Sequence, residues 1–123
     1  ILLVEDNKNH CLLYEEELGF EGYDVVTAND WNRALDKIME QIPDVIIAGS
    51  CTPETDRIYE LVGYFHNHKY IPIILNTAQS ENSDHFITRI ADACVVKSSD
   101  LSELKNKIEE LLSKELKMPG WKY

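Results

Sequence analysis

The chain is poor in basic residues, in cysteine and in long hydrophobic runs, and each shortage excludes a class of protein. It has 12 lysines and arginines against 22 aspartates and glutamates, a formal net charge of −10. A charge of this sign repels phosphate backbones and anionic lipid, so we expect no direct binding to nucleic acid or to a membrane. The three cysteines, Cys11, Cys51 and Cys94, form no paired-ligand pattern, which favours reduced thiols in the cytoplasm. No hydrophobic run approaches the ~18 residues of a membrane span.

Length and hydrophobic content bound the number of domains. With 123 residues, 44% of them hydrophobic, the chain is long enough for one compact core and too short for two. It contains no internal repeat and no low-complexity stretch. Pro119 and Gly120 end the last helical pattern. We therefore expect one domain over residues 1–116, followed by a tail or the start of a linker over residues 117–123.

Short hydrophobic runs alternate with helical patterns along the chain. Five runs predict strands, namely Ile1–Val4, Asp24–Thr27, Val45–Ala48, Ile71–Leu75 and Ala93–Val96. The first, third and fourth are almost continuously hydrophobic, which is typical of parallel strands covered on both faces. Strands that alternate with helices predict a parallel sheet with right-handed crossovers, and so an α/β fold.

Three of the segments between or after these runs carry hydrophobic residues at helical spacing. The clearest stripe consists of Leu101, Leu104, Ile108, Leu111 and Leu112. Asp100 and Glu103 stand at its start with the spacing of a capping box. The other two stripes are Trp31, Ala34, Leu35, Ile38 and Met39, and Ile58, Leu61, Val62 and Phe65.

Polar residues gather where the hydrophobic runs end. Glu5 and Asp6 follow the first run, and the third run ends at Gly49. Thr77 follows the fourth run and Lys97 follows the fifth. In an open parallel sheet the ligand site lies at the carboxyl ends of the strands, where the strand order reverses. Two adjacent carboxylates, a hydroxyl and an ammonium at that edge indicate a phosphoryl-transfer pocket.

The spacing of these residues resembles the receiver domain of bacterial two-component response regulators, from Ile1 to about Leu112. The resemblance implies a flavodoxin-like (βα)5 fold, a three-layer sandwich around a parallel five-stranded sheet of order 2-1-3-4-5. In that family the residue four positions before the proline of the third loop, here Pro53, accepts a phosphoryl group. That position is Gly49, and glycine has no side chain to carry the group.

The resemblance also assigns the other pocket residues. Asp6 matches the carboxylate that binds Mg²⁺, Glu5 matches its acidic neighbour, and Cys51 matches a ligand that acts through its backbone carbonyl. Thr77 matches the hydroxyl that bonds a phosphoryl oxygen, and Lys97 matches the ammonium that pairs with the acceptor. Because the acceptor carboxylate is missing, we expect Mg²⁺ to bind weakly if at all, with no other cofactor. We also expect Lys97 to pair with Glu5 or Asp6.

Three further departures from the family pattern point the same way. Cys94 occupies the position of the aromatic residue that swings inward when a receiver is activated. Arg57 replaces a usual glycine. Thr77 and Lys97 are closer together in the sequence than is usual in the family. This shorter segment predicts a short or irregular fourth helix around Ser83–Ile90. These changes suggest that the phosphorylation machinery has decayed while the scaffold remains.

Some of the same residues have simpler interpretations. Glu5 and Asp6 could be an acidic pair favoured by the dipole of the helix that follows. His66 and His68 could suggest a metal, but side chains two positions apart on a helix diverge, so a solvated helix end is the better interpretation. His10 is isolated in the sequence.

The sequence therefore predicts a pseudo-receiver, a non-enzymatic module for protein interactions in two-component, or phosphorelay, signalling. The resemblance implies signalling partners, either a histidine kinase or an output domain, and a possible homodimer through the fourth helix, fifth strand and fifth helix. One alternative is a conventional phosphorylatable receiver whose acceptor aspartate was exchanged for glycine by engineering. A nucleotide- or flavin-binding domain of similar fold is less well supported, because no glycine-rich loop follows the first strand.

Overall fold

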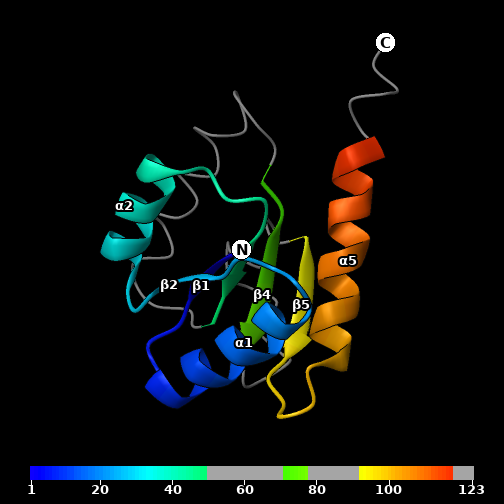
Figure 1. Cartoon of the computed structure of the whole chain (residues 1–123), viewed down its shortest axis with the longest axis horizontal. Helices are drawn as coiled ribbons and strands as arrows, with labels where there is room; N and C mark the ends of the chain where they lie inside the picture. The colour runs from blue at the N-terminus through cyan, green and yellow to red at the C-terminus, as the bar shows by residue number, and fades with distance from the viewer. Residues whose placement is uncertain (50–70, 78–91, 118–123) are drawn as a thin grey trace.

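Five parallel strands form one sheet in the computed structural model (Figure 1), which describes residues 1–49, 71–77 and 92–117. The strands are β1 (Leu2–Val4), β2 (Val26–Ala28), β3 (Ile46–Ala48), β4 (Ile73–Thr77) and β5 (Ala93–Val96). Their order across the sheet is β2-β1-β3-β4-β5, and each neighbouring pair is parallel. The predicted fold class and strand order are confirmed.

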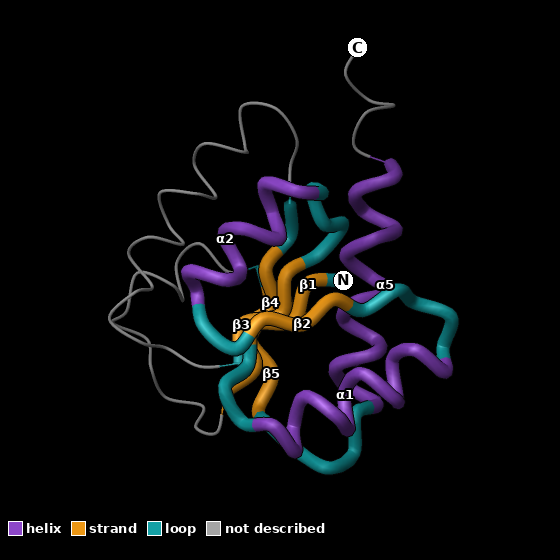
Figure 2. Tube along the Cα trace, turned by 60° about the vertical axis from the view of Figure 1, so that its left-hand side comes forward, coloured by secondary structure: helices purple, strands orange, loops and turns teal. Residues whose placement is uncertain are grey.

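Helices cover both faces of this sheet. They are α1 (Lys8–Phe20), α2 (Trp31–Glu40) and α5 (Ser102–Lys117). Figure 2 shows α2 on one side of the strands and α1 with α5 on the other. None of the helices in the described ranges is long and apolar enough to cross a membrane. The helices predicted around Ile58–Phe65 and Ser83–Ile90 lie outside the described residues.

The central strands place alternate side chains in two separate hydrophobic cores. Leu2 and Val4 of β1 belong to the cluster that contains α2, whereas Leu3 belongs to the cluster that contains α1 and α5. In β3, Ile46 joins the first cluster and Ile47 the second. Successive side chains of a strand point to opposite faces, so a strand buried on both faces needs an unbroken hydrophobic run. This explains the composition of the central runs.

β1 and β3 begin one residue later than predicted, and two other strands differ more from their predicted bounds. β2 begins at Val26 rather than Asp24, because the chain is still turning out of α1 at Tyr23, whose amide donates to the Leu18 carbonyl at 3.2 Å. β4 runs from Ile73 to Thr77 rather than over Ile71–Leu75. It extends further because Asn76 and Thr77 pair with β5, although a hydrophobicity pattern alone assigns polar residues to the loop.

The start of α5 differs from the predicted capping box. The carboxylate oxygen Oδ1 of Asp100 accepts from the Ser102 amide at 3.0 Å and from the Ser102 hydroxyl at 2.7 Å. The Asp100 amide donates to the Ser98 hydroxyl oxygen at 3.1 Å, so it does not need the Glu103 carboxylate. Asp100 still stabilises the helix start, but through Ser102 rather than through a reciprocal bond with Glu103.

Candidate functional site

The parallel register aligns the ends of the central strands at one edge of the sheet. Val4 pairs with Ala48, and Ala48 pairs with Leu75, so Glu5 and Gly49 are neighbours one position further along. The Gly49 amide donates to the Val4 carbonyl oxygen at 2.7 Å. The first and third strands therefore deliver their terminal residues to one point, as the sequence predicts.

Glu5 is the central residue of this site, and its carboxylate is completely buried. Its oxygen Oε1 lies 2.9 Å from Lys97 Nζ, whose side chain is 16% exposed. Its oxygen Oε2 accepts from the Asn7 amide at 3.0 Å. A buried carboxylate is stable only when a positive charge and hydrogen-bond donors compensate for its lost hydration, and Lys97 and the Asn7 amide do this here. The expected pairing of Lys97 with a remaining carboxylate is confirmed, and the partner is Glu5.

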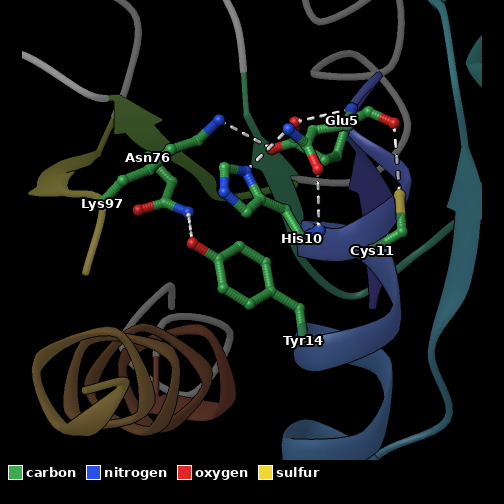
Figure 3. A network of polar contacts seen from close by, with 7 residues as sticks. Glu5, His10, Cys11, Tyr14, Asn76 and Lys97 are labelled. Carbon is green, nitrogen blue, oxygen red and sulfur yellow. Dashed lines mark hydrogen bonds and ion pairs between the residues drawn. The ribbon is translucent and has the colours of Figure 1, made fainter. Parts of the chain in front are cut away.

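Two residues in the first turn and a half of α1 also contact Glu5 (Figure 3). His10 Nδ1 lies 3.7 Å from Glu5 Oε2, so His10 is not isolated in the folded chain. The Cys11 thiol donates to the Glu5 backbone carbonyl at 3.2 Å. Burial raises the pKa of the Cys11 thiol, and the nearby Glu5 carboxylate raises it further. Cys11 is therefore a poor nucleophile and holds the Glu5 backbone in place.

A buried hydrogen bond ties α1 to β4 beside this site. The Asn76 side-chain amide donates to the Tyr14 hydroxyl at 2.9 Å, and both residues are 1% exposed. The His10 ring stacks on the Tyr14 ring with 6.2 Å between the centroids. Figure 3 shows the Asn76–Tyr14 hydrogen bond next to the His10 ring. No sequence pattern identifies this link, because the partners are 62 positions apart.

Gly49 is buried, and the side chain of Glu5 fills the space beside it. A Cβ atom at position 49 would lie 3.0 Å from Glu5 Cδ and 2.9 Å from the Val4 carbonyl oxygen, and it would overlap Glu5 Oε1. The structure therefore has no room for a side chain at position 49 while Glu5 keeps this conformation.

The other predicted pocket residues are less completely placed. Asp6 is exposed, next to Glu5 in the chain. Thr77 ends β4 and pairs with Val96 of β5, but its side chain lies outside what the structure describes. Cys94 is exposed on β5. Cys51, the predicted carbonyl ligand, also lies outside the described residues.

A cleft of about 780 Å³ opens between α1 and α2 beside the buried carboxylate. Glu5 and Asp6 line it, together with side chains of both helices and of the loop after β2. We call it the α1–α2 cleft. It contains acidic and basic side chains from both helices, among them Lys8, Glu15 and Arg33.

The described residues do not fit a Mg²⁺ ion. Magnesium requires a near-octahedral shell of oxygen ligands. Both oxygens of Glu5 already face Lys97 or the Asn7 amide, and Gly49 has no side-chain oxygen. Asp6 is the one carboxylate of the described pocket that is exposed to solvent. Within the described ranges no group of three or more His, Cys, Asp or Glu residues is arranged to hold a metal.

Comparisons with known proteins agree with the fold. The family described as the response regulator receiver domain matches residues 1–109. The response regulator ArlR of Staphylococcus aureus is 32% identical over 117 residues, which cover 94% of this chain and 53% of ArlR. The chain thus spans about half the length of the curated relatives it matches.

Two solved structures of one relative are also similar. The response regulator TrrA of Thermotoga maritima, in complex with Mg²⁺ and beryllium fluoride, has a TM-score of 0.75 and 35% identity, covering 89% of this chain and 96% of TrrA. TrrA in complex with the histidine kinase ThkA has a TM-score of 0.74 and 36% identity, covering 90% of this chain and 96% of TrrA. The chain therefore belongs to the family of response regulator receiver domains.

Proposed function

We propose that this receiver domain acts as a protein-interaction module without phosphorylation at its usual site. The observation that carries the proposal is the arrangement at Gly49, where a buried glutamate already fills the space of the missing side chain and pairs with Lys97. Glycine cannot form an acyl phosphate. The scaffold, with its five strands and strand-end pocket, is retained.

The pairing of Lys97 also argues for a single pocket state. A ligand shifts a conformational equilibrium only by its differential affinity for two states. Here the ammonium that would respond to a phosphoryl group is bound to Glu5 at 2.9 Å. Cys94 adds to this, because it offers no aromatic ring to swing between two positions. A phosphoryl donor therefore has no acceptor and little to move.

The partners follow from the family. TrrA is solved with the histidine kinase ThkA, and we propose a histidine kinase or an output domain as the partner of this chain. A homodimer through the fourth helix, β5 and α5 is a second proposed contact. We propose a cytoplasmic location, no enzymatic activity, no contact with nucleic acid or membrane, and weak Mg²⁺ binding if any. The receiver unit would comprise residues 1–116, with a tail over 117–123.

A titration followed by NMR tests the proposal. Acetyl phosphate, or beryllofluoride with Mg²⁺, is added to the unmodified domain and to Gly49→Asp. The unmodified domain should show no chemical-shift changes that reach β5 and α5. Changes that spread through residues 93–112 of the unmodified domain would contradict the proposal.

The extent of the response in Gly49→Asp separates this proposal from a conventional receiver that has lost only its acceptor. That alternative draws support from Asp6 and Lys97, which are both retained. If decay has gone further, the response in Gly49→Asp should stay near the pocket. A response that spreads to β5 and α5 would favour the alternative.

A further inference from the structure

We propose that Glu5 is an internal substitute for the acceptor carboxylate, and that its position depends on the absence of a side chain at Gly49. In the structure Glu5 occupies the acceptor's place and pairs with Lys97. Any side chain at position 49 would move the Glu5 carboxylate into the α1–α2 cleft. The inference rests on the proposed function, because it explains how the pocket stays closed to metal and phosphoryl donors.

The first atom of any side chain at position 49 would meet the Glu5 carboxylate. A Cβ there would overlap Glu5 Oε1 and lie 3.0 Å from Glu5 Cδ. Interiors are close-packed, and such contacts are relieved by moving the softer partner. The Glu5 carboxylate is the end of a flexible side chain, so it moves first. The Val4 carbonyl oxygen, 2.9 Å from the same Cβ, can give way only by a small shift of the backbone.

The backbone of Glu5 is anchored, so only its side chain can leave. The Glu5 amide donates to the Ala28 carbonyl at 3.0 Å. The Glu5 carbonyl accepts from the Cys11 thiol at 3.2 Å. Glu5 also lines the α1–α2 cleft. Rotation about its side-chain bonds therefore has a defined destination, where water can solvate the carboxylate.

Lys97 carries a positive charge that needs a partner in the pocket. With glycine at position 49, Glu5 is that partner. An alanine at position 49 would displace Glu5 without replacing its charge, so Lys97 would lose its partner. An aspartate at position 49 would displace Glu5 and supply a new carboxylate, so Lys97 would be paired again. Alanine and aspartate thus have opposite consequences for Lys97 but the same consequence for Glu5.

The reactivity of Lys97 toward an amine-acylating reagent measures this exchange. The acylation rate of Lys97 is determined by mass spectrometry in the unmodified domain and in Gly49→Ala, Gly49→Asp and Glu5→Gln. Lys107 of α5, whose side chain is 40% exposed and lies outside the α1–α2 cleft, serves as the internal reference in each protein. We expect a rise of at least about tenfold at Lys97 in Gly49→Ala and in Glu5→Gln, since loss of one partner from a buried pair is a large change. Gly49→Asp should stay as slow as the unmodified domain.

Gly19→Ala is the matched control, because a Cβ at that position meets nothing within 4 Å. It should leave the acylation of Lys97 unchanged. Equal Lys97 rates in Gly49→Ala and Gly19→Ala would overturn the inference. If Gly49→Ala does not fold, Glu5→Gln, which keeps the shape of the side chain, decides alone, and an unchanged rate there also overturns it. These outcomes are independent of the NMR titration, so the proposed function and this inference can fail separately.

Discussion

Two lysine–glutamate pairs in this molecule have almost the same distance and very different surroundings. Lys97 Nζ lies 2.9 Å from Glu5 Oε1, whose side chain is fully buried. Lys105 Nζ of α5 lies 3.0 Å from Glu17 Oε1 of α1, whose side chain is 46% exposed. Lys105 also lies 3.3 Å from Glu21 Oε2. Distance alone therefore does not determine what an ion pair contributes to stability.

The difference arises from what happens when one partner is removed. A buried carboxylate without its cation retains the full cost of lost hydration. An exposed carboxylate is solvated by water at once, so an exposed pair contributes little measurable stability. By this criterion the loss of one partner should cost far more stability at the Glu5–Lys97 pair than at the Lys105 pairs. The Lys105 pairs are a surface link between α1 and α5.

The largest effect should follow from removing Lys97. Lys97→Met leaves the Glu5 carboxylate buried without its cation, and we expect a loss of about 3 kcal/mol in the free energy of unfolding. We expect a loss near the low end of the usual range of about 3–5 kcal/mol, because Glu5 lines the α1–α2 cleft, where water could solvate a displaced carboxylate. Denaturation with urea, analysed with equal slopes, measures this loss.

Lys105→Met is the matched control for that experiment. It removes the same charge from a lysine at nearly the same distance from its glutamate. We expect a loss several times smaller than that of Lys97→Met, because water replaces the lost partner. Equal losses in the two variants would show that burial has no influence on what these ion pairs contribute to stability.

The Glu5–Lys97 pair shows which part of the pocket could be predicted from the sequence. Glu5 and Lys97 are predicted at the same sheet edge because parallel strands end together. Lys97 pairs with Glu5 and not with Asp6 because of the directions of their side chains. A hydrophobicity pattern does not predict those directions. The overlap of Glu5 with the space beside Gly49 is likewise a property of three dimensions.

The first helix shows why other parts of the site could not be predicted. Leu12 of α1 is 59% exposed and Phe20 is 89% exposed, while Tyr14 and Leu18 are buried. Hydrophobic residues therefore occur on both faces of α1 and form no single stripe. The contact between Tyr14 and Asn76 could not be predicted either. A polar residue at a strand end, such as Asn76, is ordinarily assigned to the pocket or to solvent.

A smaller effect should follow from removing the hydroxyl of Tyr14. Tyr14→Phe leaves the buried Asn76 amide without its acceptor, and we expect a loss of about 1–3 kcal/mol in unfolding free energy. The double variant Tyr14→Phe/Asn76→Leu removes both polar groups and should recover most of that loss. Urea denaturation of the three proteins checks this. A double variant less stable than Tyr14→Phe would show that the Asn76 side chain stabilises the fold through a contact other than the Tyr14 hydroxyl.

The smallest effect concerns the exposed member of the comparison and depends on pH. The hydrogen bond to Glu17, with a further contribution from Glu21, raises the pKa of Lys105 above its ordinary value. A raised pKa in the folded state means that folding favours the protonated lysine. The stabilisation is therefore complete below the unfolded lysine pKa of about 10.4, and it is lost as the pH rises through the higher folded value. The thermal midpoint of the unmodified domain should exceed that of Lys105→Met by a small, constant margin from neutral pH to about pH 10, and the margin should shrink above it. Added salt should reduce the margin at neutral pH, because exposed charges are screened within about 10 Å at 0.1 M ionic strength. A margin that persists at high pH and high salt would show that the methylene groups of Lys105, rather than its charge, link α1 to α5.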